Sequence, residues 1–208
     1  MKTCACVIVC ALSAVAAADV VQLAGGPYQA NNGGEFTVIP VSGFCGLVGQ
    51  PSDLSPTTFQ TFCVEATEQF APGVPLDFVI NTGAVQGSVG GFDALDARTA
   101  YLYFNFRMGT LLGYDYTPGG RAVSADALQR AIWFIEGEDP GANNAFVALA
   151  DAAVAPGGEW DGLGIGPVRV LNLSNQERPY AQDQLTLIPA PGALVIVGAA
   201  AMARRRRR

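Results

Sequence analysis

The 208-residue chain contains no histidine, and its only lysine is Lys2. The absence of histidine excludes Ser-His-Asp and Cys-His catalysis within the chain. Cysteine is also scarce: of the five, three lie in the first ten residues, and only Cys45 and Cys63 lie in the body of the chain. Two body cysteines leave two uses open, a structural disulfide or a reactive thiol.

Residues 1–18 have the layout of a secretory signal peptide. Lys2 precedes an apolar run that ends in Ala16-Ala17-Ala18, and the first charged residue after it is Asp19. A charged start, an apolar stretch and a small-residue cleavage site are the three parts of such a signal. We therefore expect an exported protein whose mature chain begins near Asp19.

Residues 189–208 form a second biased segment. Pro189-Ala190-Pro191 precedes an apolar stretch and the terminal cluster Arg204–Arg208. This order resembles the PEP-CTERM sorting tail of bacterial exported proteins, with alanine in place of the central glutamate. The resemblance implies that the tail enters the membrane and is then processed by an exosortase-like enzyme. A plain membrane anchor with positive-inside arginines is the alternative.

The segment between these ends, residues 19–188, is strongly acidic. It holds all 18 acidic residues and six arginines, so its net charge is −12. Nucleic acid is therefore not an expected partner. Its length is that of one domain.

Hydrophobic periodicity in this segment predicts strands, then helices, then strands. Alternating runs indicate strands at 35–41, 57–65 and 75–82, with closing strands at 166–174 and 183–188. Helical patterns cover 93–112, 124–138 and 143–155, the second with Ser124 as its N-cap. We predict an α+β domain: an antiparallel β-sheet or barrel with an inserted helical subdomain at about 93–155.

Cys63 lies in the stretch "FCVE" of the second predicted strand. Alternation along a strand places Cys63 and Glu65 on the same face. In an exported chain, a Cys45–Cys63 disulfide is one use of this thiol, typically worth ~3 kcal/mol of stability. Glu65 is either a solvated carboxylate or a group that moves protons to and from the thiol.

A second motif, "LQRAIW" at 128–133, lies on the predicted helix 124–138. Its apolar residues form a stripe, and Gln129 lies at the edge of that stripe. Taken alone, such a glutamine is expected to hydrogen-bond backbone groups.

Together, "FCVE" and "LQRAIW" resemble the paired signatures of bacterial surface thioester domains. In that family an aromatic-Cys-Val/Ile-acid motif and a later apolar-Gln-x-Ala-Ile-Trp motif supply an intramolecular thioester. The resemblance implies a Cys63–Gln129 thioester that attaches the protein covalently, through an amide link, to an amine-bearing surface or matrix molecule such as a protein lysine or a polyamine. It implies adhesion or matrix crosslinking at the cell surface, without enzymatic turnover and without a cofactor.

Two further expectations bear on this hypothesis. The alternative function is that of a non-catalytic structural envelope or matrix protein with a Cys45–Cys63 disulfide. The acidic turn at 136–144 offers oxygen donors, but its spacing does not match an EF-hand, and we predict no metal site there.

Overall fold

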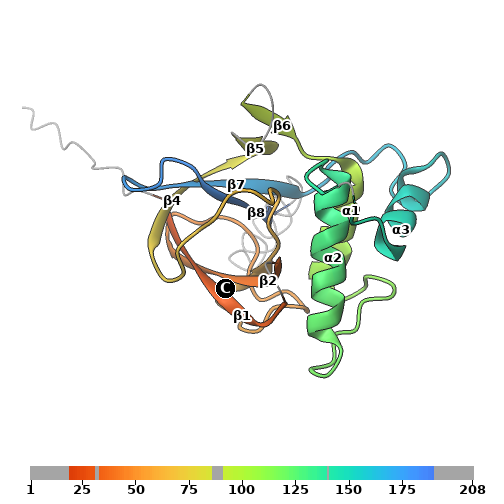
Figure 1. Cartoon of the computed structure of the whole chain (residues 1–208), viewed down its shortest axis with the longest axis horizontal. Coiled ribbons are helices and arrows are strands. Elements are labelled where there is room, and N and C mark those ends of the chain that lie inside the picture. The colour runs from red at the N-terminus through yellow and green to blue at the C-terminus, as the bar shows by residue number, and fades with distance from the viewer. Residues whose placement is uncertain (1–18, 31–32, 86–90, 140, 190–208) are drawn as a thin grey trace, which may run out of the picture.

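The computed structural model describes residues 19–30, 33–85, 91–139 and 141–189, which adopt an α+β fold (Figure 1). Six strands form one sheet in the order β3-β2-β1-β4-β7-β8, and each neighbouring pair is antiparallel. These strands are β1 (Val20–Ala30), β2 (Gly33–Ser42), β3 (Phe59–Thr61), β4 (Pro75–Asn81), β7 (Val168–Ser174) and β8 (Ala181–Leu187). The short strands β5 (Gly83–Val85) and β6 (Phe92–Ala94) form a separate pair.

Three helices follow β6 in the chain and precede β7: α1 (Ala97–Arg107), α2 (Arg121–Ile135) and α3 (Ala145–Val154). They gather at one end of the sheet (Figure 1). Helix α2 packs against β1 and β2, whereas α1 packs against α3 and β7. The glutamine motif on α2 is thereby held against the sheet.

Two apolar cores stabilise this arrangement. One lies within the sheet and contains Leu23, Val38 and Leu171, while the other joins the helices to the sheet and contains Val170 and Leu185. Val170 and Leu171 are neighbours in β7 and belong to different cores, because successive side chains of a strand point to opposite faces.

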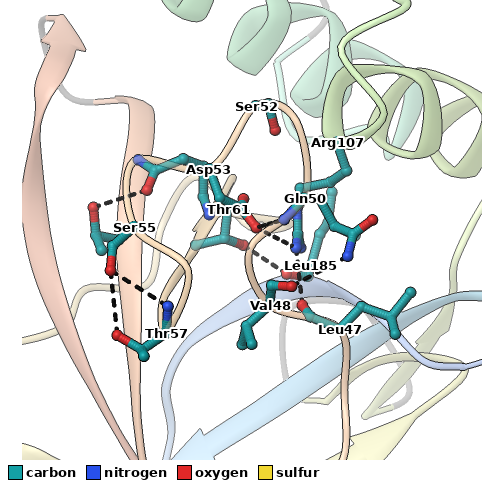
Figure 2. A network of polar contacts seen from close by, with 12 residues as sticks. Leu47, Val48, Gln50, Ser52, Asp53, Ser55, Thr57, Thr61, Arg107 and Leu185 are labelled. Atoms are coloured by element: carbon teal, nitrogen blue, oxygen red, sulfur yellow. Dashed lines mark hydrogen bonds and ion pairs between the residues drawn. The ribbon is translucent and has the colours of Figure 1, made fainter.

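A buried ion pair fastens the segment before β3 to helix α1. Figure 2 shows Arg107 of α1 beside Asp53, with 2.9 Å between Nη2 and Oδ2, and both side chains are fully buried. Arg107 Nη2 also donates to the Leu47 carbonyl at 2.9 Å. In the same network, Thr61 Oγ1 donates to the Leu185 carbonyl at 2.7 Å, which ties the end of β3 to β8.

A second buried ion pair holds the start of α2 against β2. Arg121 contacts both carboxylate oxygens of Glu35, with Nε–Oε1 at 2.6 Å and Nη2–Oε2 at 2.8 Å. The hydroxyl of Tyr114 donates to the same carboxylate. Such bidentate pairs fix geometry as well as charge, so the first turn of α2 is held at a defined position on β2.

The α+β prediction is confirmed, whereas the barrel is wrong for the described strands. The predicted strand 57–65 is reduced to β3, which is three residues long. Beyond it, the strand-type pairing with β8 among the described residues is one isolated bridge between Cys63 and Gln184. The edge strands β3 and β8 therefore do not form a ladder that closes the sheet. The sequence analysis also missed β1, because Gly25-Gly26-Pro27 interrupts its alternation.

The predicted N-cap of the second helix is also wrong. Helix α2 begins at Arg121 after Gly120, and no side chain caps it. Ser124 lies within the helix, where its hydroxyl accepts a hydrogen bond from the Asp115 backbone N–H at 3.0 Å. The contact of Arg121 with Glu35 extends the helix one turn earlier than the capping signal indicated.

The predicted signal peptide at 1–18 lies outside the described residues, as does the predicted sorting tail except for Pro189. No helix within the described part of the chain has the length and hydropathy needed to span a membrane.

Candidate functional site

Cys63 and Gln129 lie in direct contact, although 66 positions separate them in the sequence. The backbone N–H of Cys63 donates to Gln129 Oε1 at 2.9 Å, and Gln129 Nε2 donates to the Cys63 carbonyl at 2.8 Å. Cys63 is 0% exposed and Gln129 is 1% exposed. The carboxamide of α2 is therefore held in one orientation against the cysteine, in a site without water access.

A second glutamine contacts the thiol itself. Gln184 of β8 is fully buried, and its Nε2 donates to Cys63 Sγ at 3.3 Å. The isolated bridge between Cys63 and Gln184 sets the register that brings this side chain to the sulfur. A hydrogen bond to sulfur stabilises the thiolate more than the thiol.

Burial determines the protonation of Cys63. It raises the pKa of the thiol far above its ordinary value, the contact with Gln184 lowers this pKa, and the charge of Glu65 raises it. The resting cysteine is therefore a neutral thiol. Nucleophilic attack from this position requires a neighbouring group that accepts the thiol proton.

The backbone of β2 approaches Gln129 closely at Gly33. A Cβ at Gly33 would lie 2.4 Å from Gln129 Cγ and 3.1 Å from Trp133 Cη2. Only glycine leaves room for the glutamine side chain at this point. Gly33 and Trp133 therefore confine the carboxamide from the side of the sheet and from the next turn of α2.

Glu65 lies two residues after Cys63 and is 2% exposed. Burial and the neighbouring carboxyl groups of Glu68, Asp183 and Glu138 raise the pKa of Glu65 to about 9. When it is ionised, its charge raises the pKa of the Cys63 thiol, so the two groups are electrostatically linked. The Glu65 carboxyl group shares a side-chain hydrogen bond with Glu68 and makes none to the thiol.

Cys45 does not pair with Cys63. Both cysteines are free, and Cys45 is exposed whereas Cys63 is buried. The disulfide of the alternative hypothesis is therefore absent from the described structure.

Arg130 follows Gln129 in the sequence but does not belong to the site. Its side chain is 49% exposed and pairs with Asp126, one turn earlier on α2, at 3.3 Å. Successive helical residues point in different directions, so burial of Gln129 directs Arg130 to solvent.

Sequence reasoning missed Gln184, Gly33 and the carboxylates Glu68 and Asp183. The alternating polar residues of "QDQ" at 182–184 were a visible signal, because polar side chains on both faces of a buried strand require partners. Their partner could not be read from the sequence, because it depends on how β8 is aligned with Cys63.

Comparisons of the chain with models of known protein families, with curated proteins and with solved structures found no match.

Proposed function

We propose that Cys63 and Gln129 form an intramolecular thioester, through which this protein attaches covalently to amine-bearing partners. The observation that carries the proposal is the pair of hydrogen bonds, at 2.9 and 2.8 Å, that hold the Gln129 carboxamide against Cys63. A carboxamide is a poor acyl donor in water. Fixed contact with a nucleophile in a dry site offsets much of that barrier.

Thioester formation begins with attack of Cys63 Sγ on the Gln129 carbonyl carbon. The thiol proton passes to the amide nitrogen, the C–N bond breaks, and ammonia leaves, so atoms and charge balance. As negative charge grows on Gln129 Oε1, the Cys63 N–H already donates to that atom. Gln184 supports the sulfur as it loses its proton.

Glu65 serves as the proton shuttle of this step. Its pKa of about 9 leaves Glu65 protonated at neutral pH, so it gives its proton to the departing amide nitrogen and takes the proton of the weakly acidic thiol in return. The Glu65 carboxyl group makes no direct hydrogen bond to Cys63, so one of the two side chains must move before the proton is transferred.

A primary amine then completes the reaction. Its nitrogen attacks the thioester carbonyl, the C–S bond breaks, the amine proton returns to sulfur, and a stable amide joins Gln129 to the partner. The Cys63 thiol is regenerated, but the acyl donor has been consumed. The protein therefore reacts once and does not turn over, which suits adhesion or matrix crosslinking.

The proposal extends to the organisation of the chain. We propose that residues 1–18 direct export, that 19–188 form a thioester-type domain, and that 189–208 form a sorting tail handled by an exosortase-like enzyme. The helices between β6 and β7 serve as an inserted helical subdomain that carries Gln129. The support for this last point is that α1, α2 and α3 are consecutive and gather at one end of the sheet.

Reaction with methylamine tests the function. Wild-type protein should add one methylamine at Gln129 and expose one new thiol at Cys63. Cys63→Ala and Gln129→Ala should form no adduct, and the matched control Cys45→Ala should form it at the wild-type rate. Equal labelling of wild type and Cys63→Ala would remove the basis of the proposal.

A further inference from the structure

A cluster of three carboxylates lies beside the thiol site. Glu65, Glu68 and Asp183 each offer one oxygen, and these oxygens all lie within 4.8 Å of one another. Glu65 and Asp183 are each 2% exposed, and Glu68 is half-buried. Two residues come from the chain just after Cys63 and the third from β8, so tertiary structure assembles the cluster.

No positively charged side chain of the described structure pairs with this cluster. Both carboxylate oxygens of Glu65 and Oε2 of Glu68 are buried and accept no hydrogen bond from a backbone N–H, hydroxyl, amide or cationic group; the Glu65 carboxyl group meets that of Glu68 instead. None of the ion pairs among the described residues includes a member of the cluster. Burying an unpaired carboxylate is costly, and buried charges are normally paired or bound to metal. With a pKa of about 9 and a carboxyl contact with Glu68, Glu65 holds a proton where a cation could bind, and a bound cation would replace that proton.

Asp183 is oriented in the way a metal ligand requires. Its Oδ2 accepts hydrogen bonds from the Val85 N–H at 2.8 Å and from Asn172 Nδ2 at 2.6 Å, and its Oδ1 accepts one from the Leu173 N–H at 3.1 Å. Each carboxylate oxygen has lone pairs to spare for a further partner. Supporting hydrogen bonds of this kind fix the direction of a ligating carboxylate.

The donor set selects the class of cation. Three carboxylates without nitrogen or sulfur donors suit a hard cation, and Ca²⁺ accepts flexible sets of oxygen ligands at about 2.3–2.6 Å. Two oxygens that bind one Ca²⁺ ion are at most about 5 Å apart, which agrees with the spacing of the cluster. Glu68 also lines a cavity of about 330 Å³, which gives the cluster a route to solvent and space for water ligands.

We propose that Glu65, Glu68 and Asp183 bind one Ca²⁺ ion. The ion replaces the missing counter-charge of Glu65 and joins the segment after Cys63 to β8. The site shares Glu65 with the proposed proton shuttle, so bound Ca²⁺ would withdraw that shuttle, but Cys63 and Gln129 take no part in the cluster and Ca²⁺ binding can be measured whether or not the thioester forms.

Calorimetric titration of the full chain with CaCl₂, after treatment with EDTA, tests the site. One Ca²⁺ per chain should bind, with a Kd on the order of 10⁻⁴ to 10⁻³ M, the range of extracellular calcium modules. At 100-fold excess over Kd, Ca²⁺ should raise the Tm by about 5 °C relative to EDTA. MgCl₂ at the same concentration should shift the Tm much less, since Mg²⁺ demands stricter octahedral geometry.

Glu68→Gln is the informative variant, because Glu68 is half-buried and one of its oxygens lacks a partner, so the fold tolerates the change. It should weaken Ca²⁺ binding at least about tenfold, the effect of losing one charged ligand. Glu177→Gln is the matched control: it removes the same charge from an exposed position and should bind Ca²⁺ as wild type does. Absence of binding at millimolar Ca²⁺, or equal binding by wild type and Glu68→Gln, would overturn the proposal.

Discussion

At the scale of single residues, Gln184 contacts the buried thiol of Cys63. The protonation of this thiol is the feature of the site that most opposes nucleophilic attack. The Gln184 amide donates to Sγ from a fully buried position on β8. This is the described contact that lowers the thiol pKa, and burial and Glu65 both act in the opposite direction. Gln184 is therefore a positioning residue whose donor eases formation of the thiolate.

We predict that Gln184→Leu slows formation of the thioester by about tenfold, the effect of losing one hydrogen bond worth ~1.4 kcal/mol. Leucine fills a similar volume without a donor. The measurement is the fraction of chains that have lost ammonia at successive times after refolding. Gln184→Glu, which keeps the length without the amide donor, should also be slow; a normal rate in both variants would mean that Gln184 only fills space.

Glu136, which caps the C-terminal end of α2, makes the stability of the folded protein depend on pH. Burial, together with the nearby Asp96 and Asp93 charges, outweighs the contacts with Thr99 and the Asp96 backbone that lower the pKa of Glu136, and the net result is a rise from 4.5 to about 7. The folded protein therefore holds a proton that the unfolded chain releases between these two values. The contribution of Glu136 to the free energy of unfolding is therefore fully present below about pH 4.5. It is lost as the pH rises through about 7.

We expect Glu136→Gln to remove this dependence, because glutamine stays neutral at every pH. The measurement is the free energy of unfolding by urea between pH 5 and 8 for both proteins. The difference between variant and wild type should grow by on the order of 1 kcal/mol per pH unit from pH 5 to about pH 7, and it should level off between pH 7 and 8, where Glu136 is ionised in both states. A constant difference across this range would show that Glu136 ionises normally in the folded state.

At the scale of elements, the site depends on how closely β2 packs against α2. Gly33 lets the strand backbone lie against Gln129, and the Glu35–Arg121 ion pair fixes the first turn of the same helix. Both contacts come from the start of β2. The position of the carboxamide is therefore set by a strand that contributes neither reacting residue.

We predict that Gly33→Ala reduces methylamine labelling strongly while the protein still folds. The new Cβ would lie 2.4 Å from Gln129 Cγ, so the side chain must move and the carboxamide must leave its position beside Cys63. Gly119→Ala is the matched control, because a Cβ there meets no atom within 4 Å. Normal labelling of Gly33→Ala would show that the carboxamide does not need this fixed position.

The helices and strands near the site could be predicted from the sequence, whereas most of the contacts between them could not. The helix that carries Gln129 and the strand region of Cys63 follow from local periodicity, and their pairing followed from the two motifs together. The contacts of Gln184, Gly33 and Asp183 depend on the alignment of separate strands and of α2, which local periodicity does not determine. Strand β1 was missed because its central glycines and proline read as a turn.

At the scale of the whole molecule, the scarcity of lysine fits a protein that carries a reactive acyl group. The described residues include no lysine, so no side-chain amine of this part would compete with a partner for the proposed thioester. The acidic surplus of 19–188 favours encounter with cationic amines.

The tail supplies a prediction at the same scale. If 189–208 is a removable sorting signal, protein recovered from the surface of its native host should lack Arg204–Arg208. Mass spectrometry of the C-terminal peptide measures this directly. Surface protein that keeps all five arginines would identify the tail as a plain membrane anchor.

The central claim is that Cys63 and Gln129 are joined, and the intact mass of the exported, non-reduced protein tests it most directly. We predict a mass lower than that of the encoded mature chain by one ammonia molecule, with the loss mapped to Cys63 and Gln129 and absent from Cys63→Ala. A mass equal to that of the unmodified chain, or a loss of two hydrogens from a disulfide, would contradict the account.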